Sequence, residues 1–229
     1  IRPGGTTQSD AVRLAHQATF GPSEALVKII RQQGPAKWIS SQMRLNSSKY
    51  TTGGSGAIHK HTNRNRDFCS TRNSNCWRDW YSTTPLVWDF YRNATTKPDQ
   101  LRQRVAFALQ QLVVVSNLEV SGTYGLRNYH NALLANAFGN YRDILRKVTL
   151  SPVMGDYLDH VNNDKDAPNE NYARELLQLF AVGTCELNAD GSLRGGSCSA
   201  TYDNATVREY AYALTGWTYP AGGASPWGC

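Results

Sequence analysis

The sequence predicts a mainly α-helical fold, a multi-helix globular bundle with long disulfide-stapled loops. Apolar residues recur at helical spacing in many segments, helix start and stop residues flank those segments, and strand-type alternation is almost absent. The 229 residues, 40% of them hydrophobic, are enough for one substantial core. We therefore expect residues 1–229 to form a single helical domain.

Three short helices are expected at the start of the chain. The first is capped by the pair Ser9 and Asp10. The second has Ser23 as its N-cap and Gly34 as its stop, and the third begins with Pro35 in its first turn. Together they predict a compact three-helix unit.

Residues 46–84 are polar and rich in Gly, Ser and Asn, without a sustained period of 3.6 or 2, and they predict a long loop. A cross-link between Cys69 and Cys76 would hold its second half. Aromatic residues near its end suggest a sugar-stacking platform, although the last of them also fits a helix core. The candidates are Trp77, Trp80, Tyr81 and Trp88.

Helical periodicity returns at Thr84, the expected cap, with Pro85 in the first turn. A central helix follows Asp99, a helix restarts at Pro152, and another is expected over 169–182. Between 184 and 201 lies a Gly-rich insert, which we expect to be disulfide-stapled and to contain the one small β-hairpin, around Asp190 and Gly191. A last helical pattern spans 203–217.

The five cysteines favour two local disulfides, Cys69 with Cys76 and Cys185 with Cys198. Cys229 is then left to pair with a segment not present here or with another chain. Free thiols are the alternative, whereas a metal site lacks the usual clustered ligand pairs. Disulfides predict an oxidising compartment, and hence a secreted or cell-surface protein.

Three N-x-S/T triplets, at Asn46, Asn93 and Asn204, are candidate glycosylation sites in a secreted protein. No run of about 18 apolar residues occurs, so a membrane-spanning helix is not expected.

The formal net charge of +6 is distributed unevenly. Residues 1–114 carry sixteen Lys and Arg against six Asp and Glu, whereas residues 115–229 carry eight against twelve. The basic residues are scattered, and no nucleic-acid motif surrounds the one cluster, "HKHTNRNRDF". Binding of nucleic acid is therefore not favoured, and a glycan or a second copy of the chain is the preferred partner.

The segment "PNENYARELLQLF" places polar groups directly before an apolar helical stripe. We expect Asn169, Asn171, Arg174 and Glu175, joined by His160, to form a buried hydrogen-bonded network that docks this helix. The alternative is an ordinary solvated or capping role at a helix start.

Two chemistries are open to the same segment. Glu170 and Glu175, with Arg174 beside them, are the candidate catalytic residues for acid and base work on a glycoside or ester. Oxygen ligands in the preceding loop suggest calcium as a cofactor, with a solvated acidic loop as the alternative. Those ligands are Asp159, Asn162, Asp164, Asp166 and Glu170.

Five motifs appear in order: "HQATFGPS", "RQRVAFALQQLVVVS", "GNYRDILRKVTLSPVMGDYLD", "PNENYARELLQLFAVG" and "ALTGWTYP". Through them the chain resembles the bacterial and algal family known as domain of unknown function 1800. The resemblance implies a mostly helical, secreted or envelope-associated protein, of which this chain is the amino-terminal part. It implies no agreed reaction. A binding or structural role, including assembly in the extracellular matrix or envelope, is the favoured function, and hydrolysis through Glu170 and Glu175 is the alternative.

Overall fold

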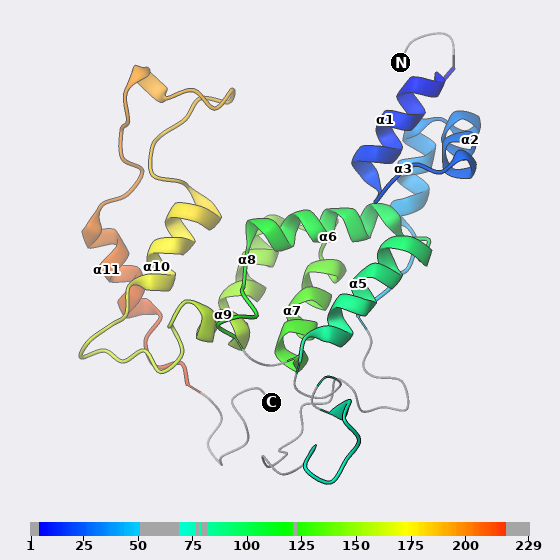
Figure 1. Cartoon of the computed structure of the whole chain (residues 1–229). Coiled ribbons are helices and arrows are strands. Elements are labelled where there is room, and N and C mark those ends of the chain that lie inside the picture. Colours follow the sequence, from blue (N-terminus) through cyan, green and yellow to red (C-terminus); the bar gives the residue numbers. More distant parts are fainter. Residues whose placement is uncertain (1–4, 51–68, 77, 79–81, 121–122, 219–229) are drawn as a thin grey trace.

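A computed structural model of the chain describes residues 5–50, 69–76, 78, 82–120 and 123–218 (Figure 1). The fold is mainly α-helical, as predicted, and strand pairing in the described residues is limited to isolated bridges. The helices are α1 (Gln8–Ala18), α2 (Glu24–Gln33), α3 (Pro35–Met43), α5 (Thr84–Thr96), α6 (Gln100–Leu112), α7 (Thr123–Ala135), α8 (Tyr141–Thr149), α9 (Pro152–Tyr157), α10 (Asn171–Glu175) and α11 (Asn204–Ala213).

Local capping chemistry decides most helix starts. The Ser23 hydroxyl accepts a hydrogen bond from the backbone N–H of Leu26, and Gly34 ends α2 with a positive φ of 80°, both as predicted. Pro35 begins α3 as predicted. The first helix differs slightly, because Thr7 is its cap in place of the Ser9 and Asp10 pair.

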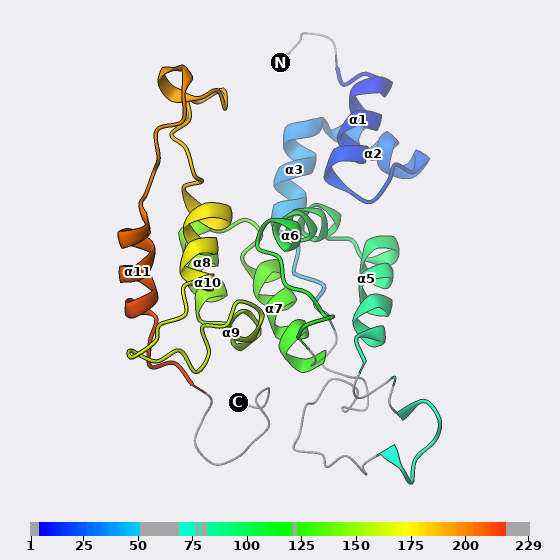
Figure 2. The same ribbon diagram turned by 60° about the vertical axis from the view of Figure 1, so that its left-hand side comes forward.

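Three hydrophobic clusters follow one another along the chain. The first joins α1, α2 and α3 through small residues packed on Ile30 and Trp38. The second and largest fills the centre, where α5 to α9 lie together (Figure 2), and includes Leu133, Met154 and Tyr172. The third joins α10 to α11, which lie side by side in both views, through Ala173, Leu177, Val207 and Ala211.

The expected single helix over 169–182 is in fact two elements. The α-helix α10 ends at Glu175, and a π-helix covers Leu176–Ala181. Such wide turns are rare and occur as single insertions within α-helices, so periodicity alone does not reveal them. The Tyr141 hydroxyl on α8 donates a 2.7 Å hydrogen bond to the Phe180 carbonyl within this wide turn.

A buried polar cluster holds the start of the 46–84 loop against α6. The Asp99 carboxylate accepts hydrogen bonds from the Ser48 N–H at 2.8 Å and the Gln103 amide at 3.0 Å. Asn93 donates to the Ser48 carbonyl and is only 1% exposed. The glycosylation prediction is therefore wrong for Asn93, because this fold has no room for a glycan there. Asn46 and Asn204 are exposed, and their modification stays a prediction.

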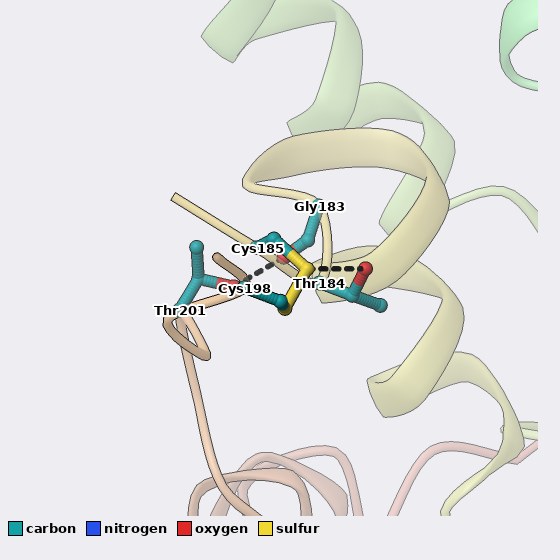
Figure 3. The surroundings of a disulfide bond; sticks show 5 residues. All are labelled: Gly183, Thr184, Cys185, Cys198 and Thr201. Carbon is teal, nitrogen blue, oxygen red and sulfur yellow. Dashed lines mark hydrogen bonds between the residues drawn. A yellow bond between two sulfur atoms is a disulfide. The ribbon is translucent and has the colours of Figure 1, made fainter. Parts of the chain in front are cut away.

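Both predicted disulfides are present, with Cα–Cα distances of 5.5 Å for Cys69–Cys76 and 5.1 Å for Cys185–Cys198. The second closes a projecting arm, residues 184–201, which extends away from the helices in both views (Figures 1 and 2). At its base, shown in Figure 3, the Thr201 hydroxyl donates to the Gly183 carbonyl.

The expected hairpin within the arm consists of two antiparallel bridges, Cys185 with Ala200 and Leu187 with Leu193. Among the described helices, none combines the length and apolar character that a bilayer crossing requires. Some predictions lie outside the described residues, namely those on Cys229 and on the ring platform of Trp77, Trp80 and Tyr81.

Candidate functional site

His160 is the buried centre of the predicted polar segment. Its Nε2 lies 2.9 Å from the Thr149 carbonyl, which can only accept, so Nε2 carries the proton and donates. Its ring lies 4.2 Å from the Tyr172 ring between centroids, and the Tyr172 hydroxyl is 2.7 Å from that of Thr149. Burial lowers the pKa of His160, which favours the neutral ring. These contacts tie the loop before α10 to the end of α8.

Asn163, also buried, connects this loop to the end of the described chain. Its side-chain oxygen accepts from the Asn169 N–H at 2.7 Å, and its amide donates to the Ala211 carbonyl at 3.3 Å. Its own carbonyl accepts from the Gly216 N–H at 2.8 Å, where the positive φ of 87° suits glycine. Asn163 therefore joins the 159–170 loop to the "LTGW" segment, a clasp that links α10 and α11 independently of their apolar contact.

The predicted buried network is wrong for two of its members. Asn169 and Asn171 are exposed, and the Asn171 amide donates to the Asp159 carboxylate at 3.1 Å. Arg174 donates to Glu170 at 2.9 Å in a partly exposed pair of the kind that contributes little to stability. The physical reason is that Asn169 precedes α10 and Asn171 lies on its outer side, while Tyr172 and Ala173 occupy its buried side.

Glu175 differs from its neighbours. Its Oε2 atom is buried and has no hydrogen-bond partner among the described residues. Glu170, the other predicted catalytic carboxylate, is held by Arg174 and has Arg208 at 3.9 Å. The structure gives the two glutamates different surroundings, a partly exposed ion pair for Glu170 and a buried unpartnered oxygen for Glu175.

The predicted calcium ligands are not gathered. The described residues contain no cluster of three or more His, Cys, Asp or Glu side chains arranged to hold a metal. The Asp164 carboxylate instead accepts from the backbone N–H groups of Asp166 and Ala167, at 2.9 and 3.1 Å. Asp159 is engaged by Asn171. These carboxylates stabilise turns, so the calcium prediction finds no support in the geometry.

A different site lies between α5, α6 and α7, a cleft of about 320 Å³ that we call the aromatic cleft. Aromatic rings from separate segments line it, namely Tyr50, Phe90, Tyr91 and Phe107. Polar side chains converge on the same space, namely Thr83, Gln110, Asn117 and His130. The described lining residues include no Asp, Glu, Lys or Arg. An apolar pocket with a few convergent polar groups is the usual form of a small-molecule site.

Two pairs of contacts position the rings in this cleft. Asn131 on α7 exchanges hydrogen bonds with the backbone of Tyr50, accepting from its N–H at 2.9 Å and donating to its carbonyl at 3.2 Å. The Tyr50 ring then stacks on His130 with 5.4 Å between centroids. Phe90 and Phe107 lie 5.4 Å apart across the α5 and α6 interface.

His130 is a residue of the lining whose pKa is strongly changed by its surroundings. Burial lowers the pKa of His130 to about 4, so the imidazole is neutral at physiological pH. Its Nδ1 atom is buried and has no hydrogen-bond partner among the described residues. A buried polar atom without a partner lowers the stability of the folded state.

Sequence reasoning missed this cleft. It assigns no role to His130 or to Tyr50, which lies in a segment without periodicity. The residues come from four segments whose proximity depends on helix packing, so no local pattern could have revealed them. Trp88, from the predicted platform, is exposed beside the cleft with the Arg78 guanidinium 4.8 Å from its ring centroid.

The comparison with known families identifies the chain at the level of family. Residues 13–227 match the family described as "Protein of unknown function (DUF1800)". The chain belongs to that family. No curated protein and no solved structure matches the chain. Within the DUF1800 chain, the motifs "PNENYARE" and "ALTGW" are the two sides of the clasp described above.

Proposed function

We propose that this DUF1800 chain is a secreted or cell-surface binding protein whose aromatic cleft holds a neutral sugar ring of a glycan. The observation that carries the proposal is a cleft of about 320 Å³ in which aromatic rings from separate segments and uncharged polar side chains, His130 among them, line the same space. That volume is close to the lower end of small-molecule pockets, roughly 300 Å³, which fits one ring better than a long ligand.

The chemistry of the lining favours a sugar over other small rings. Aromatic faces such as Tyr91 pack against the C–H faces of a sugar, while amides and imidazole exchange hydrogen bonds with its hydroxyls. Because the described lining carries no charged side chain, a charged ligand would lose hydration without gaining an ionic partner. The two disulfides support an oxidising, extracellular location, where glycans are abundant.

Binding can be tested by calorimetry and on an array of neutral glucose-, galactose-, mannose- and N-acetylglucosamine-based oligosaccharides. Tyr91, 63% exposed at the cleft, is the residue to remove. We expect Tyr91→Ala to weaken binding about tenfold or more, equivalent to about 1.4 kcal/mol. Trp88→Ala is the matched control, because this exposed ring lies on the same helix and does not line the cleft.

Two results would contradict the proposal. One is that no neutral saccharide on the array binds the wild-type chain. The other is that binding survives Tyr91→Ala and is lost in Trp88→Ala, which would assign the sugar to the exposed face of α5.

Hydrolysis of a glycoside or ester is the second candidate, favoured by the unpartnered buried Oε2 of Glu175. It requires turnover of nitrophenyl glycosides or esters that falls at least 100-fold in Glu175→Gln, since proton transfer contributes rate factors of roughly that size. The folded state of the variant can be checked by circular dichroism. Turnover unchanged in Glu175→Gln would exclude this role for the residue.

A further inference from the structure

A second cavity lies on another side of α7, where residues of α7, α8 and the start of α9 line it. Its volume is about 170 Å³. Tyr129 lines this cavity, while its chain neighbour His130 lines the aromatic cleft. Successive residues of a helix point about 100° apart, so the two spaces are separate.

Most of the wall of this second cavity is apolar. It is formed by Ala132 together with side chains of the central cluster, chiefly Leu133, Ile144, Val148 and Val153. An engineered apolar cavity of about 150 Å³ is known to stay dry and to bind benzene. The space between α7, α8 and α9 is therefore of the size that takes one aromatic ring, and a ring there would restore dispersion contacts that an unfilled cavity lacks.

The polar part of the cavity wall indicates which substituent an aromatic ligand in the cavity would carry. Lys147 on α8 lines the cavity together with Ser151, four residues further along the chain, and Asn128 on α7. The described lining contains no acidic residue, and the ion pairs of the described structure do not use Lys147. An ammonium group and a hydroxyl at the edge of an apolar cavity suit a carboxylate, which accepts hydrogen bonds from both.

We propose that the α7–α8–α9 cavity is a second binding site, for a small aryl carboxylate whose ring fills the apolar space and whose carboxylate meets Lys147 and Ser151. The site is independent of the aromatic cleft and of the sugar proposed there. The two proposed sites thus place ligands of different character on two sides of α7, a neutral polar ring in the aromatic cleft and an anionic aryl ring in the α7–α8–α9 cavity.

Three probes of the same size and different charge test the site: benzoate, benzyl alcohol and benzylamine. We expect benzoate to bind the wild-type chain about tenfold more tightly than benzyl alcohol, and benzylamine not to bind, as measured by calorimetry or ligand-observed NMR. Lys147→Met should remove the advantage of benzoate over benzyl alcohol. Arg146→Met is the control, because it removes the same charge from the neighbouring position of α8, and it should leave the ratio unchanged.

Filling the cavity gives a second readout. Ala132→Leu places a larger side chain in the space and should abolish binding of all uncharged and anionic probes, with circular dichroism confirming that the helices persist. Lys147 is exposed, so Lys147→Met keeps the test decisive even if Ala132→Leu unfolds. Equal binding of benzoate and benzylamine, or no binding of benzoate, would overturn the proposal. Tyr91→Ala should leave benzoate binding intact, so failure at one site is distinguishable from failure at the other.

Discussion

His130 and His160 occupy similar surroundings with opposite outcomes. Each ring packs on a tyrosine, each is kept neutral by burial, and each has a buried Nδ1 without a partner in the described structure. His160, however, is fixed through Nε2 to the Thr149 carbonyl, whereas His130 lines an open cleft. The difference teaches that burial can keep a histidine neutral both inside a packed loop and in the wall of an open cleft, so a lowered pKa alone does not distinguish the two.

The loop that carries His160 should be destabilised most strongly by removing the Asn163 side chain. We expect Asn163→Ala to lower the free energy of unfolding by about 3 kcal/mol, because the change leaves the Asn169 N–H and the Ala211 carbonyl without partners. Urea unfolding followed by circular dichroism measures this loss. Asn188→Ala in the exposed arm is the control, with an expected change below about 0.5 kcal/mol.

The pH dependence of stability sharpens the comparison. The folded-state pKa of His130, about 4, lies below the ordinary value of 6.5, so between these values the unfolded chain binds more protons than the folded one. The contribution of neutral His130 to the free energy of unfolding is therefore fully present above pH 6.5. It is lost as the pH drops toward 4, by about 3 kcal/mol for this shift. The lowered pKa of His160 acts in the same direction.

Urea midpoints measured between pH 7.5 and pH 4 would test this slope, and the variant His130→Asn should flatten it. A slope unchanged in that variant would mean that His130 is not held neutral by the fold. The lowered pKa values of Asp190 and Asp203 act below their ordinary value of 3.8, outside this window.

The buried Tyr172 beside His160 can be compared with the exposed Tyr91 at the aromatic cleft. Tyr172→Phe removes the bond to Thr149, and we expect a loss of about 1 kcal/mol in unfolding free energy. Tyr91→Phe at the exposed edge of the cleft should change stability by less than about 0.5 kcal/mol. Equal losses in the two variants would show that the hydrogen bond between Tyr172 and Thr149 contributes no more to stability than the exposed Tyr91 hydroxyl does.

The smallest effect on global stability is expected for the arm. Cross-links that close loops of about 15 residues contribute roughly 3 kcal/mol when the loop folds with the core. Residues 187–200 are exposed, so we expect the double variant Cys185→Ser, Cys198→Ser to lose less than about 0.5 kcal/mol. The readout that should respond is limited proteolysis, with faster cleavage inside 186–200.

The sequence predicts the local parts of this molecule well. Ser23, Gly34 and Pro35 act through their own backbone, and both disulfides close short loops, so neighbouring residues suffice to predict them. Asn163 is different, because its partner at Ala211 lies 48 residues away. In the segment "PNENYARE" the buried residues are Tyr172 and Ala173, whereas the sequence pattern predicts that Asn169 and Asn171 are buried. An asparagine at a helix start can be solvated or buried, and the sequence does not distinguish the two.

The π-helix at Leu176–Ala181 also sets the direction in which the arm leaves the helix. One residue corresponds to a rotation of about 100° around a helix axis, so a regular α-helix here would send residues 184–201 off in another direction. Removing a single residue from this stretch would thus re-orient the projecting loop while leaving its own cross-link untouched. Evolution by one-residue insertion or deletion could in this way redirect the arm without redesigning it.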